Sequence, residues 1–153
     1  MVDEKGAPRL YSVVMPPDRE AAAESPDVVA IRRLKAAYIT HLNAKDWPRL
    51  GELFIEEASV SYENGESQYE GRDAILDYLI TSVGHLEALH VASNDRIELR
   101  GPDRAAGQWD LRFQWHDPWD NTYLRGEGTY FDEYVRTDDG WRISFTSFAV
   151  TES

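Results

Sequence analysis

The stretch from Tyr38 to Tyr62 constrains the fold of this chain most, because it joins one amphipathic helix to a short second helix and a first strand. Apolar side chains recur at the three-and-four spacing of a buried helical face, at Ile31, Leu34, Tyr38 and Leu42. This spacing predicts a helix that Ser25 or Asp27 caps, that runs to about residue 42, and that ends beside Asn43.

A second, short helix is predicted next. Asp46 stands before a Trp-Pro pair, which is the order typical of an N-cap followed by a proline in the first turn. We expect Leu53 and Phe54 to fill the inner face of this helix, and Val60 and Tyr62 to begin the first strand.

One more helix and four strands are predicted after the first strand. The helix opens at Arg72 and ends at Gly84, where a left-handed glycine is a common terminator. Alternating segments then predict strands at residues 88–100, 104–116, 122–136 and 141–150. Helices followed by antiparallel strands indicate an α+β fold. Three glycines inside the strands would let the sheet curl and leave a conical cavity, namely Gly107, Gly126 and Gly128.

The length of 153 residues fits one domain. Residues 1–27 carry four prolines and show no sustained period, so we predict an extended or partly disordered N-terminal arm there. Residues 28–153 are predicted to form the single domain.

Composition excludes several classes of partner. The chain has 28 acidic and 16 basic residues, a formal charge of −12, which would repel nucleic acid and anionic membranes. It has no cysteine, which excludes disulfides and thiolate chemistry. No apolar run reaches the length of a bilayer span and no export signal is evident, so we expect a cytoplasmic protein.

The order and spacing of these segments, with YEGRDAILDYLI as a helix and GEGTYFDEYVRTDDGWRI as the closing hairpin, resemble the nuclear transport factor 2-like superfamily in its SnoaL-like polyketide cyclase and dehydratase branch. The resemblance covers roughly residues 28–150. It implies a cone-shaped α+β barrel whose curled antiparallel sheet wraps around N-terminal helices. It also implies a lyase, isomerase or cyclase without a cofactor, acting on a small apolar or aromatic molecule of polyketide-like or steroid-like character.

His90 is the main candidate for chemistry. Along its predicted strand it alternates with Leu89 and Val91, so it should share its face with Ala92 and Asn94. A histidine facing a cavity can accept and return a proton near neutral pH, whereas a histidine in a solid core would only hydrogen-bond its neighbours.

The resemblance assigns catalytic roles to three residues. Scytalone dehydratase, bile acid 7α-dehydratase and hexachlorocyclohexane dehydrochlorinase use a histidine at the position of His90, paired with an aspartate that falls on Asn43 here. Tyr38 matches a tyrosine that lines the site and would donate a hydrogen bond, although it could equally be a core tyrosine. With Asn43, either His90 works as a lone base, or the site has changed function, or an aspartate was replaced by design to disable the protein.

The same resemblance implies a substrate pocket. Its predicted lining, which could instead fill a solid core, is Leu42, Tyr62, Leu111, Phe113, Tyr130 and Phe148. Tyr62 and Asn64 also match limonene epoxide hydrolase, and Asp110 matches one member of its relay. Gln108 stands where that relay needs arginine, so this reaction is disfavoured.

The alternatives to an enzyme are a binding or accessory protein with a degenerate active site and a structural subunit like the β subunit of ring-hydroxylating dioxygenases. We expect no metal, because the four histidines lie on separate elements without ligand-like spacing, at His41, His85, His90 and His116. The expected partners are a small-molecule ligand and further copies of this chain, in a homodimer or homotrimer.

Overall fold

The computed structural model describes residues 25–152. Internal contacts divide the chain into residues 1–32 and residues 33–153, with the boundary inside the first helix. The predicted N-terminal arm, residues 1–27, falls almost wholly outside the described residues.

The described chain begins with the two predicted helices. Helix α3 spans Pro26–Ala44, and Ser25 caps it by accepting a hydrogen bond from the Val28 N–H. The spacing of its apolar residues correctly predicted a buried face, at Ile31, Leu34, Tyr38 and Leu42. Helix α4 is a single turn, Trp47–Gly51, and its N-cap Asp46 accepts from the Arg49 N–H as expected. The expected inner face of α4 was wrong, because the helix ends before Leu53 and strand β2 already begins at Phe54.

Helix α5 spans Arg72–Val83 and follows a 3₁₀ turn, η1, at Glu63–Gly65. Gly84 ends α5, but with φ −61° rather than in the predicted left-handed conformation. A Cβ at this position would lie 2.3 Å from the carbonyl oxygen of Ile80. Close approach to the preceding turn, and not a positive φ, is therefore what requires a glycine here.

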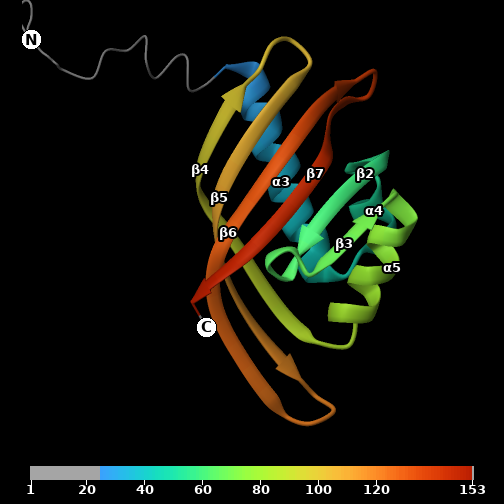
Figure 1. Cartoon of the computed structure of the whole chain (residues 1–153), viewed down its shortest axis with the longest axis vertical. Helices are drawn as coiled ribbons and strands as arrows, with labels where there is room; N and C mark the ends of the chain where they lie inside the picture. The colour runs from blue at the N-terminus through green and yellow to red at the C-terminus, as the bar shows by residue number, and fades with distance from the viewer. Residues whose placement is uncertain (1–24, 153) are drawn as a thin grey trace, which may run out of the picture. The chain divides into compact units, whose positions relative to one another are not determined.

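Six strands form one sheet in the order β3-β2-β7-β6-β5-β4. Their bounds are β2 Phe54–Tyr62, β3 Ser67–Glu70, β4 Glu87–Leu99, β5 Arg104–Asp117, β6 Thr122–Thr137 and β7 Gly140–Glu152. The predicted α+β fold with a curled sheet is confirmed (Figure 1). One feature differs from the expectation, because β2 pairs with β7 in parallel and the sheet is therefore mixed.

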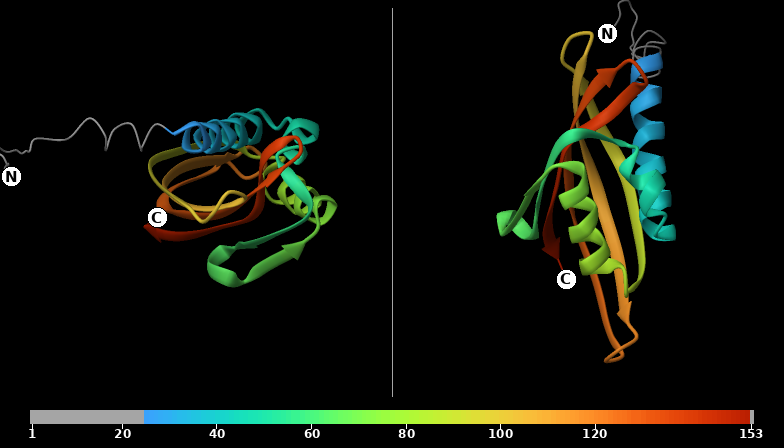
Figure 2. Two further views of the ribbon diagram at one scale, coloured as in Figure 1. Left: turned by 90° about the horizontal axis from the view of Figure 1, so that it is seen from above. Right: turned by 90° about the vertical axis from the view of Figure 1, so that its right-hand side faces the viewer.

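The sheet is curled, and β4, β5 and β6 lie side by side in it (Figure 2). Gly128 is one source of this curl, because the β6–β7 register shifts between Glu127 and Gly128. A Cβ on Gly128 would lie 2.2 Å from the Ala149 carbonyl oxygen, so only a glycine allows the two backbones to approach this closely. No helix in the described part of the chain is long and apolar enough to cross a membrane.

Candidate functional site

A cavity of about 250 Å³ lies on the inner face of the sheet, bounded by α5 and by the part of α3 after residue 33. Half of its lining side chains were predicted from the sequence, namely Tyr38, Leu42, Tyr62, His90, Tyr130 and Phe148. The other half were not, namely Glu63, Tyr78, Leu79, Ser82, Val83 and Trp115. The inner face therefore encloses a pocket lined by six of the predicted residues, and the alternative of a solid core does not describe these six.

Three tyrosines form the buried wall of the cavity, and each is 1% exposed. The phenol oxygens of Tyr38 and Tyr62 lie 3.5 Å apart, and the ring of Tyr130 meets that of Tyr38 edge to face at 5.9 Å. Burial raises the pKa of Tyr38 to about 12. It also raises the pKa values of Tyr62 and Tyr130 well above their ordinary value. All three phenols are therefore neutral hydrogen-bond donors at neutral pH.

His90 and Asn43 form the predicted pair. The Asn43 Nδ2 donates to the His90 carbonyl at 2.9 Å, and the His90 backbone N–H donates to Asn43 Oδ1 at 2.8 Å. These two backbone partners fix which end of the amide is oxygen. Since Oδ1 also lies 3.0 Å from His90 Nδ1 and can only accept, the neutral imidazole carries its proton on Nδ1.

The other ring nitrogen of His90 is also engaged. The indole Nε1–H of Trp115 donates to His90 Nε2 at 3.2 Å, across rings that meet edge to face. His90 is only 6% exposed. Burial, assisted by the positive charge of Lys35, lowers the pKa of His90 to about 4. His90 is therefore a neutral and weak base at neutral pH, with both ring nitrogens hydrogen-bonded.

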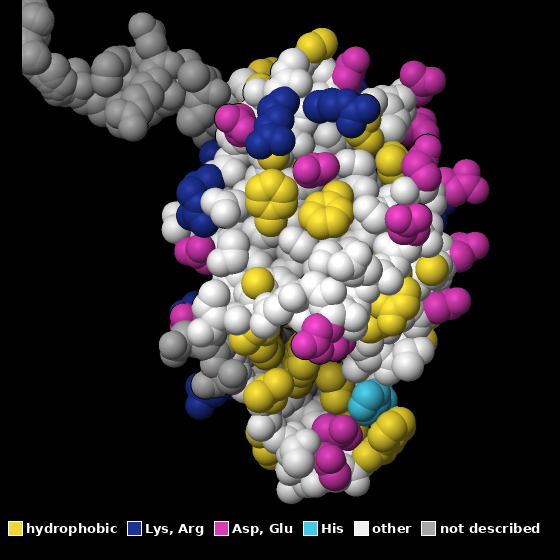
Figure 3. Space-filling model, in the orientation of Figure 1, with side chains coloured by type: hydrophobic (Ala, Val, Ile, Leu, Met, Phe, Trp, Pro, Cys, Tyr) yellow, Lys and Arg dark blue, Asp and Glu magenta, His cyan; other side chains and the backbone are white. Residues whose placement is uncertain are grey.

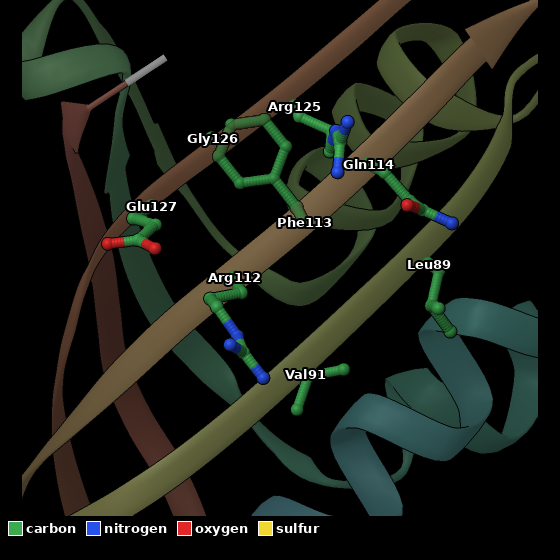
Figure 4. A pocket seen from close by; sticks show the side chains of 8 residues that line it. All are labelled: Leu89, Val91, Arg112, Phe113, Gln114, Arg125, Gly126 and Glu127. Atoms are coloured by element: carbon green, nitrogen blue, oxygen red, sulfur yellow. The ribbon is translucent and has the colours of Figure 1, made fainter.

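Three predicted site residues lie outside the cavity lining. Asn43 lies behind His90 and borders a neighbouring open groove instead. Leu111 and Phe113 pair with Gly128 and Gly126 of β6, and both are buried, at 2% and 5% exposed. Phe113 borders an open groove on the sheet together with residues of β4, β5 and β6, although it is itself buried (Figure 4). The family resemblance placed these two side chains in the pocket, but neither is among the residues that line the cavity.

The face shared with His90 is also shorter than predicted. A bulge between Ser93 and Arg96 shifts the β4–β5 register, and Asn94 takes φ 57° there. Asn94 is therefore exposed, and its amide donates to Asp110 Oδ2 at 2.9 Å. Asp110 lies on this outer side, so the epoxide hydrolase relay has no carboxylate from Asp110 in the cavity. Among the described residues, no three histidine, aspartate or glutamate side chains gather closely enough to hold a metal ion.

A buried ion pair, which the sequence did not predict, lies behind the tyrosines. Lys35 Nζ is 2.9 Å from Asp132 Oδ2, and the two side chains are 1% and 0% exposed. The contact does not have the geometry of a hydrogen bond. The Lys35 ammonium also lies over the Tyr130 ring, 3.4 Å from its centroid. Asp132 also accepts from the hydroxyls of Tyr134 at 2.7 Å and Thr146 at 2.6 Å. These contacts hold the wall that carries Tyr38 and Tyr130.

Some of the missed cavity residues left a signal in the sequence. Leu79 and Val83 are one helical turn apart on α5 and both are buried, so a helical pattern could have placed them. Trp115 lies two residues after Phe113 on β5 and therefore faces the same side of the sheet, which is the side of His90. Tyr78 and Glu63 could not have been found this way, because the phenol of Tyr78 donates to the Glu63 carboxylate across 15 residues of chain.

Comparison with known proteins identifies the fold. The family model described as the SnoaL-like domain matches residues 23–147. A scytalone dehydratase-like protein from Novosphingobium aromaticivorans DSM 12444 is 23% identical, with a TM-score of 0.76 over 89% of each chain. The hexachlorocyclohexane dehydrochlorinase LinA-type3 from Novosphingobium barchaimii LL02 is 21% identical, with a TM-score of 0.74 over 90% of this chain and 92% of the other. A protein with a cystatin-like fold from Caulobacter vibrioides gives 19% identity and a TM-score of 0.72, over 82% of this chain and 89% of the other.

Proposed function

The chain belongs to the SnoaL-like domain family, and on this basis we propose that its cavity catalyses a lyase, isomerase or cyclase reaction by proton transfer, without a cofactor. The observation that carries the proposal is the arrangement around His90. Asn43 fixes the imidazole with its proton on Nδ1, so the lone pair of Nε2 is on the cavity side, where neutral phenols gather. A general base beside hydrogen-bond donors is the arrangement that such reactions need.

In the proposed mechanism His90 Nε2 removes a proton from the substrate. The phenols of Tyr38, Tyr62 and Tyr130 then donate hydrogen bonds to the oxygen or leaving group where negative charge develops. The imidazolium keeps its Nδ1–H on Asn43 Oδ1 and returns the Nε2 proton in the second half of the reaction. Asn43 orients the ring but adds no negative charge to stabilise the imidazolium, so the base is weak.

The size of the cavity limits the substrate. Its volume of about 250 Å³ is just below the range of roughly 300–1,000 Å³ typical of pockets for drug-sized ligands. A molecule of one or two rings is therefore a better candidate than a whole steroid. Elimination is the favoured reaction, because the dehydratase-like and dehydrochlorinase neighbours are both named for eliminations.

A second candidate function is binding without turnover. Asn43 favours it, because an amide gives the imidazolium no counter-charge, while burial and the charge of Lys35 lower the pKa of His90 to about 4. An apolar ligand would bind beside the neutral phenols and the neutral imidazole without any chemistry.

Asn43→Asp separates the two functions. A carboxylate at this position would stabilise the imidazolium, so the pKa of His90 should rise by about one pH unit or more, as seen by NMR titration. In an enzyme, turnover of scytalone should rise as well, and His90→Ala should abolish it in both backgrounds. In a binding protein, the added buried charge should weaken ligand binding and produce no turnover.

The control is Asn121→Asp, which adds the same charge beside His116 Nε2 instead. It should leave the pKa of His90 unchanged. If the pKa of His90 also stays constant in Asn43→Asp, residues 43 and 90 do not act as a pair and the mechanism is wrong.

We also propose that the protein forms a homodimer or homotrimer, with the outer face of the sheet or the N-terminal arm in the interface. Leu89 and Val91 lie on that face and are 47% and 40% exposed. Figure 3 shows hydrophobic side chains gathered near the β5–β6 turn on one side of the molecule. An apolar surface of this kind is normally covered by a partner.

Light scattering should give two or three times the chain mass of 17.5 kDa. Leu89→Glu should lower the mass toward that of one chain, because it places a charge in the proposed interface. Leu99→Glu is the matched control, since Leu99 is similarly exposed at 39% but lies at the other end of β4. A wild-type protein with the mass of one chain would contradict the proposal.

A further inference from the structure

Trp115 is hydrogen-bonded to the atom that the proposed reaction needs, which is Nε2 of His90. With the Nδ1 proton directed to Asn43, the only lone pair of the neutral His90 ring is on Nε2. The indole N–H of Trp115 donates to this nitrogen at 3.2 Å. Since an indole nitrogen can only donate, the Nε2 lone pair is the acceptor in this contact. It cannot accept a substrate proton from the same direction at the same time.

Trp115 also lies between the enclosed cavity and a neighbouring open groove. It lines the enclosed cavity, and it also lines the open groove that contains Asn43, Lys45 and Gln114. The side chain is partly exposed, so there is open space beside it on the groove side. A rotation that keeps the indole N–H inside the cavity would release His90 Nε2 to a ligand there.

We propose that Trp115 is a positioning residue that holds the His90 lone pair in a hydrogen bond and releases it to a ligand that offers the indole N–H another acceptor. A buried donor without a partner is unfavourable, so a pure hydrocarbon would not compensate for the lost contact. The substrate class is thereby narrowed to molecules with a carbonyl or hydroxyl oxygen next to the proton to be removed. This second part rests on the proposed function, whereas closure of the lone pair does not.

Trp115→Phe tests the closure in the protein without substrate. A hydrogen bond donated to Nε2 favours the neutral ring, so its removal should raise the pKa of His90 by about 0.5 to 1 pH unit in an NMR titration. Diethylpyrocarbonate, which attacks unprotonated imidazole nitrogens, should modify His90 several times faster in the variant. Mass spectrometry of the same sample gives the other histidines as internal standards.

Trp109→Phe is the matched control, because the indole of Trp109 donates to the Tyr134 hydroxyl at 3.1 Å and not to His90. It should change neither the pKa nor the modification rate of His90. Faster modification in Trp115→Phe with an unchanged pKa would show that Trp115 only shields the ring, and would overturn the closure.

The acceptor requirement is tested with two probes of equal shape, cyclohexanone and methylenecyclohexane. Cyclohexanone should shift the indole N–H resonance of Trp115, which Trp115→Phe assigns, and methylenecyclohexane should not. Equal shifts with both probes, or none with either, would overturn the requirement. Neither measurement depends on turnover, so a failure of the proposed function is distinguishable from a failure of this inference.

Discussion

Asp132→Asn should lower the free energy of unfolding by about 3 to 5 kcal/mol at pH 7, because it leaves a buried ammonium without its counter-charge. Lys35 and Asp132 are 1% and 0% exposed, so water cannot take over the role of the lost carboxylate. The variant also weakens the acceptor for Tyr134 and Thr146. Urea unfolding at pH 7 measures the effect.

The loss of unfolding free energy in Asp132→Asn should become smaller as the pH rises. Burial lowers the pKa of Lys35, and Asp132 opposes that effect, so the pKa should fall further in the variant. The unfolded chain holds this proton up to about pH 10.5. Between the lowered folded pKa and that value the unfolded state binds more protons, so stability rises with pH. The deficit of Asp132→Asn should therefore be smaller at pH 9.5 than at pH 7.

An exposed ion pair provides the control. Arg100 Nε lies 2.8 Å from Glu98 Oε1, and the side chains of Glu98 and Arg100 are 71% and 53% exposed. Glu98→Gln should therefore lower the free energy of unfolding by less than about 1 kcal/mol. Lys35→Met combined with Asp132→Asn should cost less than the sum of the two single changes, because neither charge is then left alone. A loss in Asp132→Asn as small as that in Glu98→Gln would mean that Lys35 is neutral in the folded protein.

Acidification should destabilise the wild type by about 2 to 3 kcal/mol between pH 7 and pH 4.5 through His90 alone. Burial and the charge of Lys35 lower the pKa of this side chain to about 4, from an ordinary 6.5. In that interval the unfolded chain binds the proton and the folded chain does not, so stability falls as the pH falls. His90→Gln should remove this part of the pH dependence in urea unfolding at the two pH values.

His116 gives a control of opposite sign. A hydrogen bond to Glu87, supported by one to Asn121, raises the pKa of His116 above its ordinary value. Its contribution is therefore present at low pH and lost as the pH rises through the folded pKa. His116→Gln should make the acid destabilisation steeper, whereas His90→Gln should make it shallower. If the free energy of unfolding depends on pH equally in His90→Gln and in the wild type, then His90 is not held neutral in the folded protein.

The sequence by itself determined the buried face of α3 and of the part of β4 around His90. The helical spacing from Ile31 to Leu42 and the alternation of His90 with Leu89 and Val91 are local patterns, and the structure follows both. The cap at Asp46 depends only on neighbouring residues and was also predictable. For the same reason Tyr38, Tyr62 and His90 could be placed on inward faces.

Only the tertiary structure decided which of these inward residues meet. The parallel pairing of β2 with β7 depends on strand order, which no local period records. The contact from Trp115 to His90 spans 25 residues, and the ion pair of Lys35 with Asp132 joins α3 to β6. Leu111 and Phe113 are buried, at 2% and 5% exposed, yet neither lines the cavity. Periodicity reports the burial of one element, whereas a site depends on the register between elements, and bulges and strand order set that register.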